Sequence, residues 1–147
     1  MKNILCFIEA RMGSSRFPGK VLKKVNKNYR VIDYVLNNPL NSKYFNNNNI
    51  FLLTSKKEEN DALVKYVNNN YKIKIYRGSE KNVYGRIFKF IKRRKENTFL
   101  RLTADNPLVD PILINNFVGF FLKNNCDYLS SRSMDKAKAW NEKSDFP

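Results

Sequence analysis

The sequence predicts an α/β protein built on a mostly parallel sheet. Two short apolar runs, "ILCFI" at 4–8 and "IFLLT" at 50–54, are typical of strands that are buried on both faces of a sheet. Segments with helical spacing of apolar residues alternate with such runs, and the connections between them are short. Strands that alternate with helices in this way favour right-handed crossovers and parallel strand pairing.

The first half of the chain predicts two strands and two helices. After the first strand and a loop at 9–20, a short helix begins at Val31 and ends near Pro39. After the second strand, Ser55 and Glu58 form a capping-box pattern, which predicts the start of a second helix. The apolar residues of that helix share one face: Ala62, Leu63, Tyr66 and Val67.

The second half continues the alternation. "KIKIY" at 72–76 alternates as an outer strand would, and "TFLRLTA" at 98–104 is a further strand. The helix between them has apolar residues at Val83, Ile87, Phe90 and Ile91. Asp110 and Pro111 are typical N-cap and first-turn residues, so they predict the start of a last helix. Its apolar face contains Ile114, Phe117, Val118 and Phe121, and "CDYLS" at 126–130 is predicted as a final strand.

Length and composition predict one domain with a hydrophobic core. The chain has 147 residues, and its 42% hydrophobic content argues against intrinsic disorder. No apolar run approaches the ~20 residues that a membrane helix needs, and the N-terminal apolar stretch is too short for a secretory signal. We therefore expect a cytoplasmic protein with no membrane partner. Cys6 and Cys126 lie in apolar sequence without histidine in the chain, so both are predicted to be buried, reduced thiols.

The formal net charge of +15 suits a polyanionic partner such as nucleic acid or a nucleotide. The lysines, however, are spread along the whole chain and mixed with asparagines, as in the composition that an AT-rich genome favours. The aromatic residues also lack the clustered stacking pattern of a protein that binds single-stranded nucleic acid. The cations of the third helix are predicted to form an exposed face without a partner: Arg86, Lys89, Arg93, Arg94 and Lys95.

The segment "EARMGSSRFPGK" at 9–20 has the residue types of an anion site. It follows a predicted strand, and ligands of parallel sheets bind at the carboxyl ends of the strands. Its Gly-Ser-Ser turn can expose successive backbone N–H groups, and Gly13 permits close approach of the backbone. Pro18 and Gly19 predict a turn that returns the chain toward the strand end. Three cations surround the segment: Arg11, Arg16 and Lys20.

This anion site is neither a Walker P-loop nor a dinucleotide fingerprint, because the GxxxxGK[ST] and GxGxxG patterns are both absent from the chain. The alternative is a solvated basic loop that binds no ligand. The segment alone therefore indicates phosphate binding, without indicating which reaction follows.

Asp105 is predicted at the carboxyl end of the strand at 98–104, bordering the same crevice. A carboxylate there suits Mg²⁺, which takes one or two carboxylates and completes its shell with water and phosphate oxygens. The alternative is an Asx-type turn before Asn106 and Pro107. An anion site beside a metal carboxylate would indicate nucleotidyl transfer.

Four stretches together resemble one enzyme family. "IEARMGSSRFPGKVL" is similar to the start of the cytidylyltransferases that activate acidic sugars, which include CMP-KDO and CMP-sialic acid synthetases. It is most similar to their spore coat polysaccharide branch. "TSKKEENDALV", "YRGSEKNVYGR" and "RLTADNPLVDP" resemble later motifs of the family in the same order, so the resemblance runs from residue 2 to about 130.

The resemblance implies a three-layer, Rossmann-like fold of the nucleotide-diphospho-sugar transferase type. It implies transfer of CMP from CTP to an acidic sugar, with Mg²⁺ as cofactor, for surface polysaccharide synthesis. By position in the motifs, the triphosphate is expected to contact Ala10, Arg11, Gly13, Ser14, Arg16 and Lys20. Arg77 is expected near the nucleotide and Asp105 on the metal. Arg11, Lys20 and Asp105 are then the candidate catalytic residues.

Two features depart from the family pattern. Many relatives have glutamine at the position of Glu9, and a carboxylate pointing into the crevice would repel CTP, so we expect Glu9 to face a cation or a metal. Relatives also continue beyond the equivalent of Pro147 with a segment that supplies sugar contacts, dimer contacts and often a second metal aspartate. The domain at 1–130 is therefore expected to be truncated, with a polar tail at 131–147 that leads into a missing C-terminal part. A homodimer is a candidate assembly.

Alternatives from other classes stay open at this point. A charge-driven nucleic-acid-binding domain would use the net charge and the basic residues at 86–95, with salt-sensitive binding and no nucleotide preference. An inactive remnant would bind a nucleotide or a partner chain without turnover. A nucleotidyltransferase for sugar 1-phosphates or molybdopterin would share the fold, but such enzymes usually open with a more glycine-rich segment.

Overall fold

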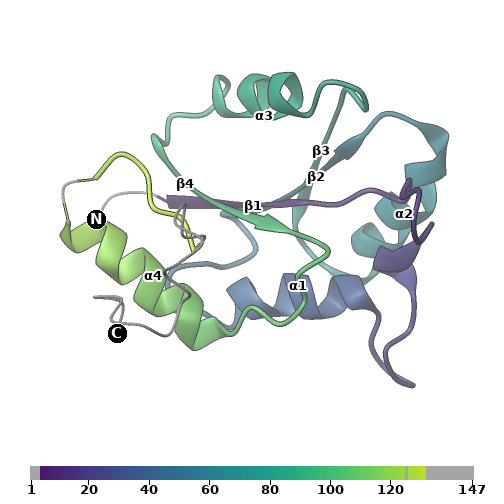
Figure 1. Cartoon of the computed structure of the whole chain (residues 1–147), viewed down its shortest axis with the longest axis horizontal. Helices are drawn as coiled ribbons and strands as arrows, with labels where there is room; N and C mark the ends of the chain where they lie inside the picture. Colours follow the sequence, from purple (N-terminus) through teal and green to yellow (C-terminus); the bar gives the residue numbers. More distant parts are fainter. Residues whose placement is uncertain (1–3, 125, 132–147) are drawn as a thin grey trace.

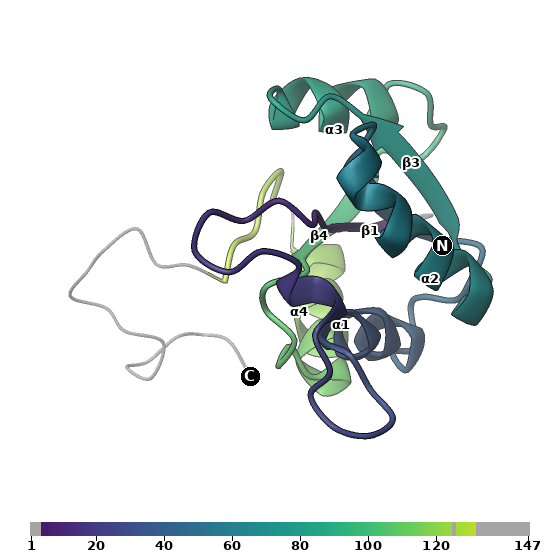
Figure 2. The ribbon, with the colours of Figure 1, turned by 90° about the vertical axis from the view of Figure 1, so that its right-hand side faces the viewer.

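The computed structural model describes residues 4–124 and 126–131 and has the predicted three-layer α/β architecture. Its four strands form one sheet in the order β3-β2-β1-β4, in which each neighbouring pair is parallel. The strands are β1 (Ile4–Glu9), β2 (Ile50–Ser55), β3 (Lys74–Gly78) and β4 (Thr98–Thr103). Helices α1 (Val31–Leu40), α2 (Asp61–Asn70) and α4 (Pro111–Lys123) cover one face, and α3 (Val83–Ile91) covers the other (Figure 1). Figure 2 shows α3 on the opposite side of the strands from α1 and α4.

The two faces of the sheet have different cores because side chains alternate along each strand. Aliphatic residues and Cys6 fill the side of α1, α2 and α4: Ile4, Cys6, Ile8, Ile50, Leu52 and Leu100. Aromatic rings fill the side of α3, where Phe90 contacts Phe7 and Phe51 edge to face at centroid distances of 5.9 and 5.1 Å. The central strands β1 and β2 are buried along their whole length, which confirms the prediction from their apolar runs.

Several element boundaries differ from the sequence prediction. The outer strand β3 is confirmed as an edge strand, but it lies two residues later than predicted. Ser55 belongs to β2 and does not cap a helix; its Oγ accepts hydrogen bonds from Lys57 N (3.2 Å) and Asn60 Nδ2 (2.8 Å). These bonds stabilise a 3-10 turn at Glu58–Asn60, and α2 begins only after it.

The final strand predicted at 126–130 is wrong. Residues 126–131 have bends and irregular backbone, and the sheet ends at β4 on this side. The apolar pattern misled because Tyr128 is 81% exposed and does not pack against the sheet. Cys126 is half-buried, whereas Cys6 is fully buried, and both are free thiols. Burial raises the pKa of Cys6 far above the ordinary range of a thiol.

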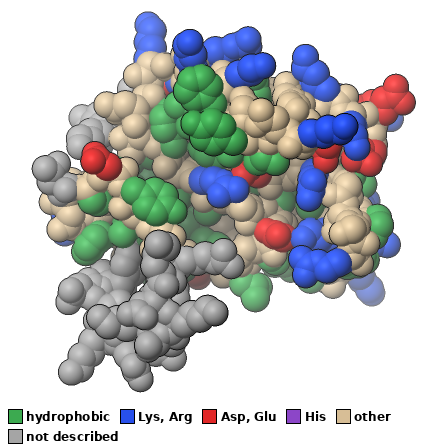
Figure 3. Space-filling model, turned by 45° about the horizontal axis from the view of Figure 1, so that its top comes forward, with side chains coloured by type: hydrophobic (Ala, Val, Ile, Leu, Met, Phe, Trp, Pro, Cys, Tyr) green, Lys and Arg blue, Asp and Glu red, His purple; other side chains and the backbone are tan. Residues whose placement is uncertain are grey.

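The exposed basic face predicted at 86–95 is wrong in part. α3 ends at Ile91, and Arg86 on that helix is only 3% exposed because it faces the sheet. The Arg94 guanidinium lies over the rings of Phe51 and Phe90, 4.3 and 4.6 Å from their centroids. Lys89, Arg93 and Lys95 are exposed. Figure 3 shows Lys and Arg side chains distributed over several parts of one face of the molecule.

None of the described helices combines the length and the apolar composition that crossing a membrane requires. The tail predicted at 131–147 lies, apart from Ser131, outside the described residues.

Candidate active site

The strand register brings two polar segments together at the carboxyl end of the sheet. Glu9, the last residue of β1, lies opposite Thr103, the last residue of β4. Ala104 N donates a hydrogen bond to Glu9 O (2.9 Å), so the ladder continues one residue beyond β4. Asp105 therefore leaves the sheet beside the buried Ala10, where the loop after β1 begins.

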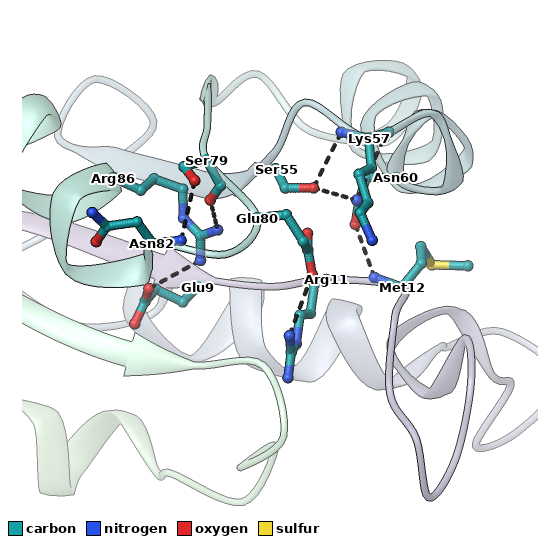
Figure 4. A network of polar contacts seen from close by, with 10 residues as sticks. All are labelled: Glu9, Arg11, Met12, Ser55, Lys57, Asn60, Ser79, Glu80, Asn82 and Arg86. Atoms are coloured by element: carbon teal, nitrogen blue, oxygen red, sulfur yellow. Dashed lines mark hydrogen bonds and ion pairs between the residues drawn. The ribbon is translucent and has the colours of Figure 1, made fainter.

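The loop after β1 is closed at its base and attached to the sheet. Gly19 N donates to Met12 O (2.9 Å), and Gly19 has φ of 68°, a left-handed conformation that glycine adopts without steric cost. Met12 N donates to Oδ1 of Asn60 (2.9 Å), whose fully buried amide in turn donates to Ser55 Oγ (2.8 Å). The turn predicted at Pro18 and Gly19 is thus present, and the buried Asn60 holds the loop in place (Figure 4).

Inside the closed loop the backbone is open to a ligand. The Phe17 amide donates a hydrogen bond to Ser14 Oγ (3.3 Å). The backbone amides of residues 13–16 donate to no group of the described chain. Arg16 is exposed and has no ion-pair partner among the described residues. A Cβ on Gly13 would lie 2.7 Å from Glu59 Oε1, so a larger residue would displace that carboxylate. Successive unpaired amides beside cations can bind an anion.

Two cations of the loop are each paired with a carboxylate from a distant part of the chain. Lys20 Nζ lies 3.4 Å from Asp105 Oδ2, across 85 residues of sequence. Arg11 Nη1 lies 3.3 Å from Glu80 Oε1, on the turn between β3 and α3. Arg11 and Asp105 have side chains that are 57% exposed, whereas their partners Glu80 and Lys20 are 14% and 29% exposed. Water screens the exposed member of each pair, so each pair is weaker than a fully buried one and an anionic ligand can compete for the cation.

Both of these carboxylates are ionised at neutral pH. A hydrogen bond from Thr103 and the charge of Lys20 hold the pKa of Asp105 below its ordinary value, despite some desolvation. Hydrogen bonds from Ser55 and Arg11 likewise lower the pKa of Glu80. The site thus combines cations with two negative charges.

Asp105 also fits the predicted metal role. The described residues contain no cluster of three or more Asp, Glu, His or Cys side chains that could enclose a metal ion. Mg²⁺ bound to a nucleotide needs only one or two protein carboxylates, because phosphate and water oxygens supply the rest of its shell. An ionised, largely exposed carboxylate beside a loop with unpaired amides and cations suits that mode, and the metal itself stays a prediction.

The guanidinium of Arg77 contacts the segment that connects β2 to α2. Its Nε donates to Ser55 O (3.0 Å), its Nη2 to Lys57 O (3.0 Å), and its Nη1 lies 2.7 Å from Asp61 Oδ1. Arg77 lies at the carboxyl end of β3 and lines a cavity together with Glu80, and neither Lys20 nor Asp105 lines that cavity. Its contact with the nucleotide stays a prediction.

Glu9 faces two cations, as the sequence led us to expect. Its Oε1 lies 3.3 Å from Arg86 Nη2, and its Oε2 lies 2.6 Å from both Nε and Nη2 of Arg101. Arg86 Nη1 also donates to Ser79 O (2.7 Å), which attaches the turn that carries Glu80 (Figure 4). Glu9 therefore points away from the loop and toward α3.

The sequence interpretation missed the partners of these residues. A signal for Arg86 was present, because it lies three residues after Val83 and four before Phe90, on the apolar side of α3. No local pattern distinguishes Asn60, Glu80 or Arg101 from the other polar residues of the chain.

The chain matches known proteins over most of its length. The family model described as "Cytidylyltransferase" matches residues 5–142. The chain belongs to the cytidylyltransferase family. The spore coat polysaccharide biosynthesis protein SpsF of Bacillus subtilis is 36% identical over 131 residues, which cover 87% of this chain and 53% of that protein. An uncharacterised protein of Methanocaldococcus jannaschii is 34% identical over 131 residues, covering 89% of this chain and 52% of that protein. This cytidylyltransferase chain thus spans about half the length of these curated relatives.

Solved structures agree on the fold of this cytidylyltransferase chain. A cytidylyltransferase from Leptospira borgpetersenii has a TM-score of 0.75 at 27% identity, over 84% of this chain and 50% of that one. A CMP:2-keto-3-deoxy-manno-octonic acid synthetase complexed with CTP has a TM-score of 0.66 at 18% identity, over 82% and 48%. The second likeness concerns the fold alone.

Proposed function

We propose that the chain forms the nucleotide-binding part of an enzyme that transfers CMP from CTP to a hydroxyl of an acidic sugar. The observation that carries the proposal is the contact between Lys20 and Asp105, 3.4 Å apart at the carboxyl ends of β1 and β4. It joins a phosphate-binding loop to a candidate metal carboxylate. Membership of the cytidylyltransferase family supports CTP as the nucleotide.

In this proposal the triphosphate lies on the loop after β1. The amides of Gly13, Ser14 and the next two residues would donate to phosphate oxygens, with Ala10 buried beneath them. Arg11 and Arg16 would bind phosphate oxygens through the forked guanidinium, and Lys20 would act as a point charge. Binding would release Arg11 from Glu80 and Lys20 from Asp105.

The reaction needs positioning and charge neutralisation more than an enzymic nucleophile. The sugar hydroxyl oxygen attacks the α-phosphorus in line, the bond to the bridging oxygen of pyrophosphate breaks, and the hydroxyl proton is lost to solvent. A bound Mg²⁺, held by Asp105 and phosphate oxygens, would neutralise part of the charge on the triphosphate. Arg11 and Lys20 would stabilise the charge that develops on the departing pyrophosphate.

Two further parts of the proposal concern the biological setting. The name of the Bacillus subtilis relative supports a product that serves surface polysaccharide synthesis. The proposed location is the cytoplasm, because CTP is available there. Because the chain spans about half of its curated relatives, the acidic sugar and the homodimer are proposals for the whole enzyme.

Thermal unfolding of the purified chain with CTP, UTP, ATP or GTP, each with Mg²⁺, tests the proposal. We expect CTP to raise the melting temperature most, and Lys20→Ala to remove most of that rise. Lys65→Ala, on the exposed side of α2, is the matched control and should respond as the unmodified chain does. Where pyrophosphate release from CTP is measurable, Lys20→Ala should slow it about 10²–10³-fold.

The same measurement, repeated with heparin in place of the nucleotide, separates the alternatives. An equal response to all nucleotides and to heparin would instead favour charge-driven binding of nucleic acid. A CTP response that Lys20→Ala leaves intact would refute the site.

A further inference from the structure

A cavity of about 860 Å³ lies along β4, the strand at one edge of the sheet. Hydroxyl, amide and aromatic side chains from β4, α4 and residues 127–131 line it. Among them is Asp105, the carboxylate that contacts Lys20 of the phosphate-binding loop. The cavity therefore adjoins the proposed triphosphate site, where the second substrate of a CMP transfer must lie.

The wall of this cavity suits a polyhydroxylated ligand. Thr103 and Asn106 contribute groups that can donate and accept hydrogen bonds, while Phe117 and Tyr128 contribute aromatic surface. Sugar rings combine hydroxyl edges with apolar C–H faces, so a wall that mixes both kinds of side chain matches them.

Arg101 is the cation of this cavity, and it belongs to a cluster with an excess of positive charge. The cluster consists of Glu9, Arg86 and Arg101, which together carry two positive charges and one negative charge. The side chains of Arg86 and Glu9 are 3% and 8% exposed, whereas that of Arg101 is 55% exposed. Glu9 contacts both cations, Arg101 at 2.6 Å and Arg86 at 3.3 Å, so the cluster as a whole keeps one positive charge, and its accessible guanidinium is that of Arg101.

The guanidinium of Arg101 also has an unused edge. Its Nε and Nη2 both contact Glu9 Oε2 at 2.6 Å, which fixes the plane of the group. Its Nη1 donates to no group of the described chain. An arginine held in this way can bind a second carboxylate without losing much conformational freedom.

We propose that Arg101 selects the sugar substrate by binding its carboxylate in the cavity beside Asp105. This inference rests on the proposed function, because it identifies the cavity as the site of the sugar. A neutral sugar would leave the excess charge of the cluster unpaired, so the site would favour an acid. If Arg101 only forms an ion pair with Glu9, replacing Arg101 has no effect on the binding of any sugar.

The test measures binding of two sugar acids, KDO and N-acetylneuraminic acid, and of their methyl esters to the full chain with CTP and Mg²⁺. Isothermal titration or ligand-observed NMR gives the affinities. We expect the chain to bind at least one acid about 10- to 100-fold more tightly than its ester, since the ester has lost the charge. Arg101→Gln should abolish that preference and leave CTP affinity unchanged.

Three controls keep the result interpretable. Arg93→Gln removes an exposed arginine outside the cavity and should preserve the preference for the acid. Arg101→Lys keeps the charge but lacks the fork, so it should restore only part of the preference. Melting temperatures of all variants show whether each is folded.

The outcomes separate this inference from the proposed function. An acid-over-ester preference that survives Arg101→Gln, or no preference in the unmodified chain, overturns the role of Arg101. If the unmodified chain does not prefer CTP over the other nucleotides, the proposed function is overturned instead. An acid preference that depends on Arg101 but appears without CTP selectivity would keep the carboxylate site and reject the cytidylyl reaction.

Discussion

Two carboxylate–cation pairs lie at the carboxyl end of the sheet, Glu9–Arg86 and Asp105–Lys20. They have similar chemical groups but differ in burial. The side chains of Glu9 and Arg86 are 8% and 3% exposed, whereas those of Asp105 and Lys20 are 57% and 29% exposed. Removing one partner of a buried pair leaves an uncompensated charge in a poorly solvated place. The exposed pair has water as an alternative partner, so it can separate when a ligand binds. Glu9–Arg86 therefore holds the scaffold, and Lys20–Asp105 is available for function.

The largest expected effect is on the buried pair. Arg86→Met should lower the free energy of unfolding by about 3 kcal/mol, the lower end for breaking a buried pair, because Glu9 retains Arg101 as a partner. It also removes the hydrogen bond to Ser79 O that attaches the turn after β3. Urea unfolding followed by circular dichroism measures the change. Lys89→Met, an exposed cation on the same helix, is the control and should stay within about 0.5 kcal/mol. Equal effects of the two variants would show that the buried Arg86 stabilises the fold no more than an exposed cation does.

Breaking the exposed pair should have a small effect on the stability of the ligand-free chain and a large effect on CTP binding. We expect Lys20→Ala to change the free energy of unfolding of the ligand-free chain by less than about 1 kcal/mol, since the lost pair is exposed. The same variant should lose most of the stabilisation by CTP described above. Urea unfolding with and without CTP measures both quantities on one sample. A variant that is strongly destabilised without ligand would place Lys20 with the scaffold instead.

The smallest expected effect is on the pH dependence of stability. The folded chain lowers the pKa of Asp105 from 3.8 and of Glu80 from 4.5. A lowered pKa means that the contribution to stability is complete above the ordinary value and is lost as the pH falls below it. Melting temperature should therefore decline as the pH drops through 4.5 and 3.8. Because Asp105 is largely exposed, Asp105→Asn should reduce that decline only slightly. An unchanged or larger decline in this variant would show that Asp105 gains nothing from Lys20 and Thr103.

Local patterns in the sequence predicted much of the fold and part of the site. Continuous apolar runs identified β1 and β2, because a strand buried on both faces has no polar side. Asp110 was predicted as an N-cap, and its Oδ1 does accept a hydrogen bond from Ile112 N (2.6 Å). The prediction failed at 126–130, where apolar residues follow α4 but the sheet ends at β4. Pairing of strands depends on contacts that a local pattern does not contain.

The sequence by itself determined the family, the alternation of strands and helices as far as α4, and the closed loop that presents Arg11, Ser14 and Lys20, because each depends on residues close together in the chain. Only the tertiary structure decided which charges meet. Glu9 and Arg86 are 77 residues apart, and Lys20 and Asp105 are 85 apart. The parallel register of β1 with β4, and the packing of α3 on the sheet, bring these groups within contact and bury one pair but not the other. Burial, which no residue specifies alone, separates the cations that support the fold from those that can bind a ligand.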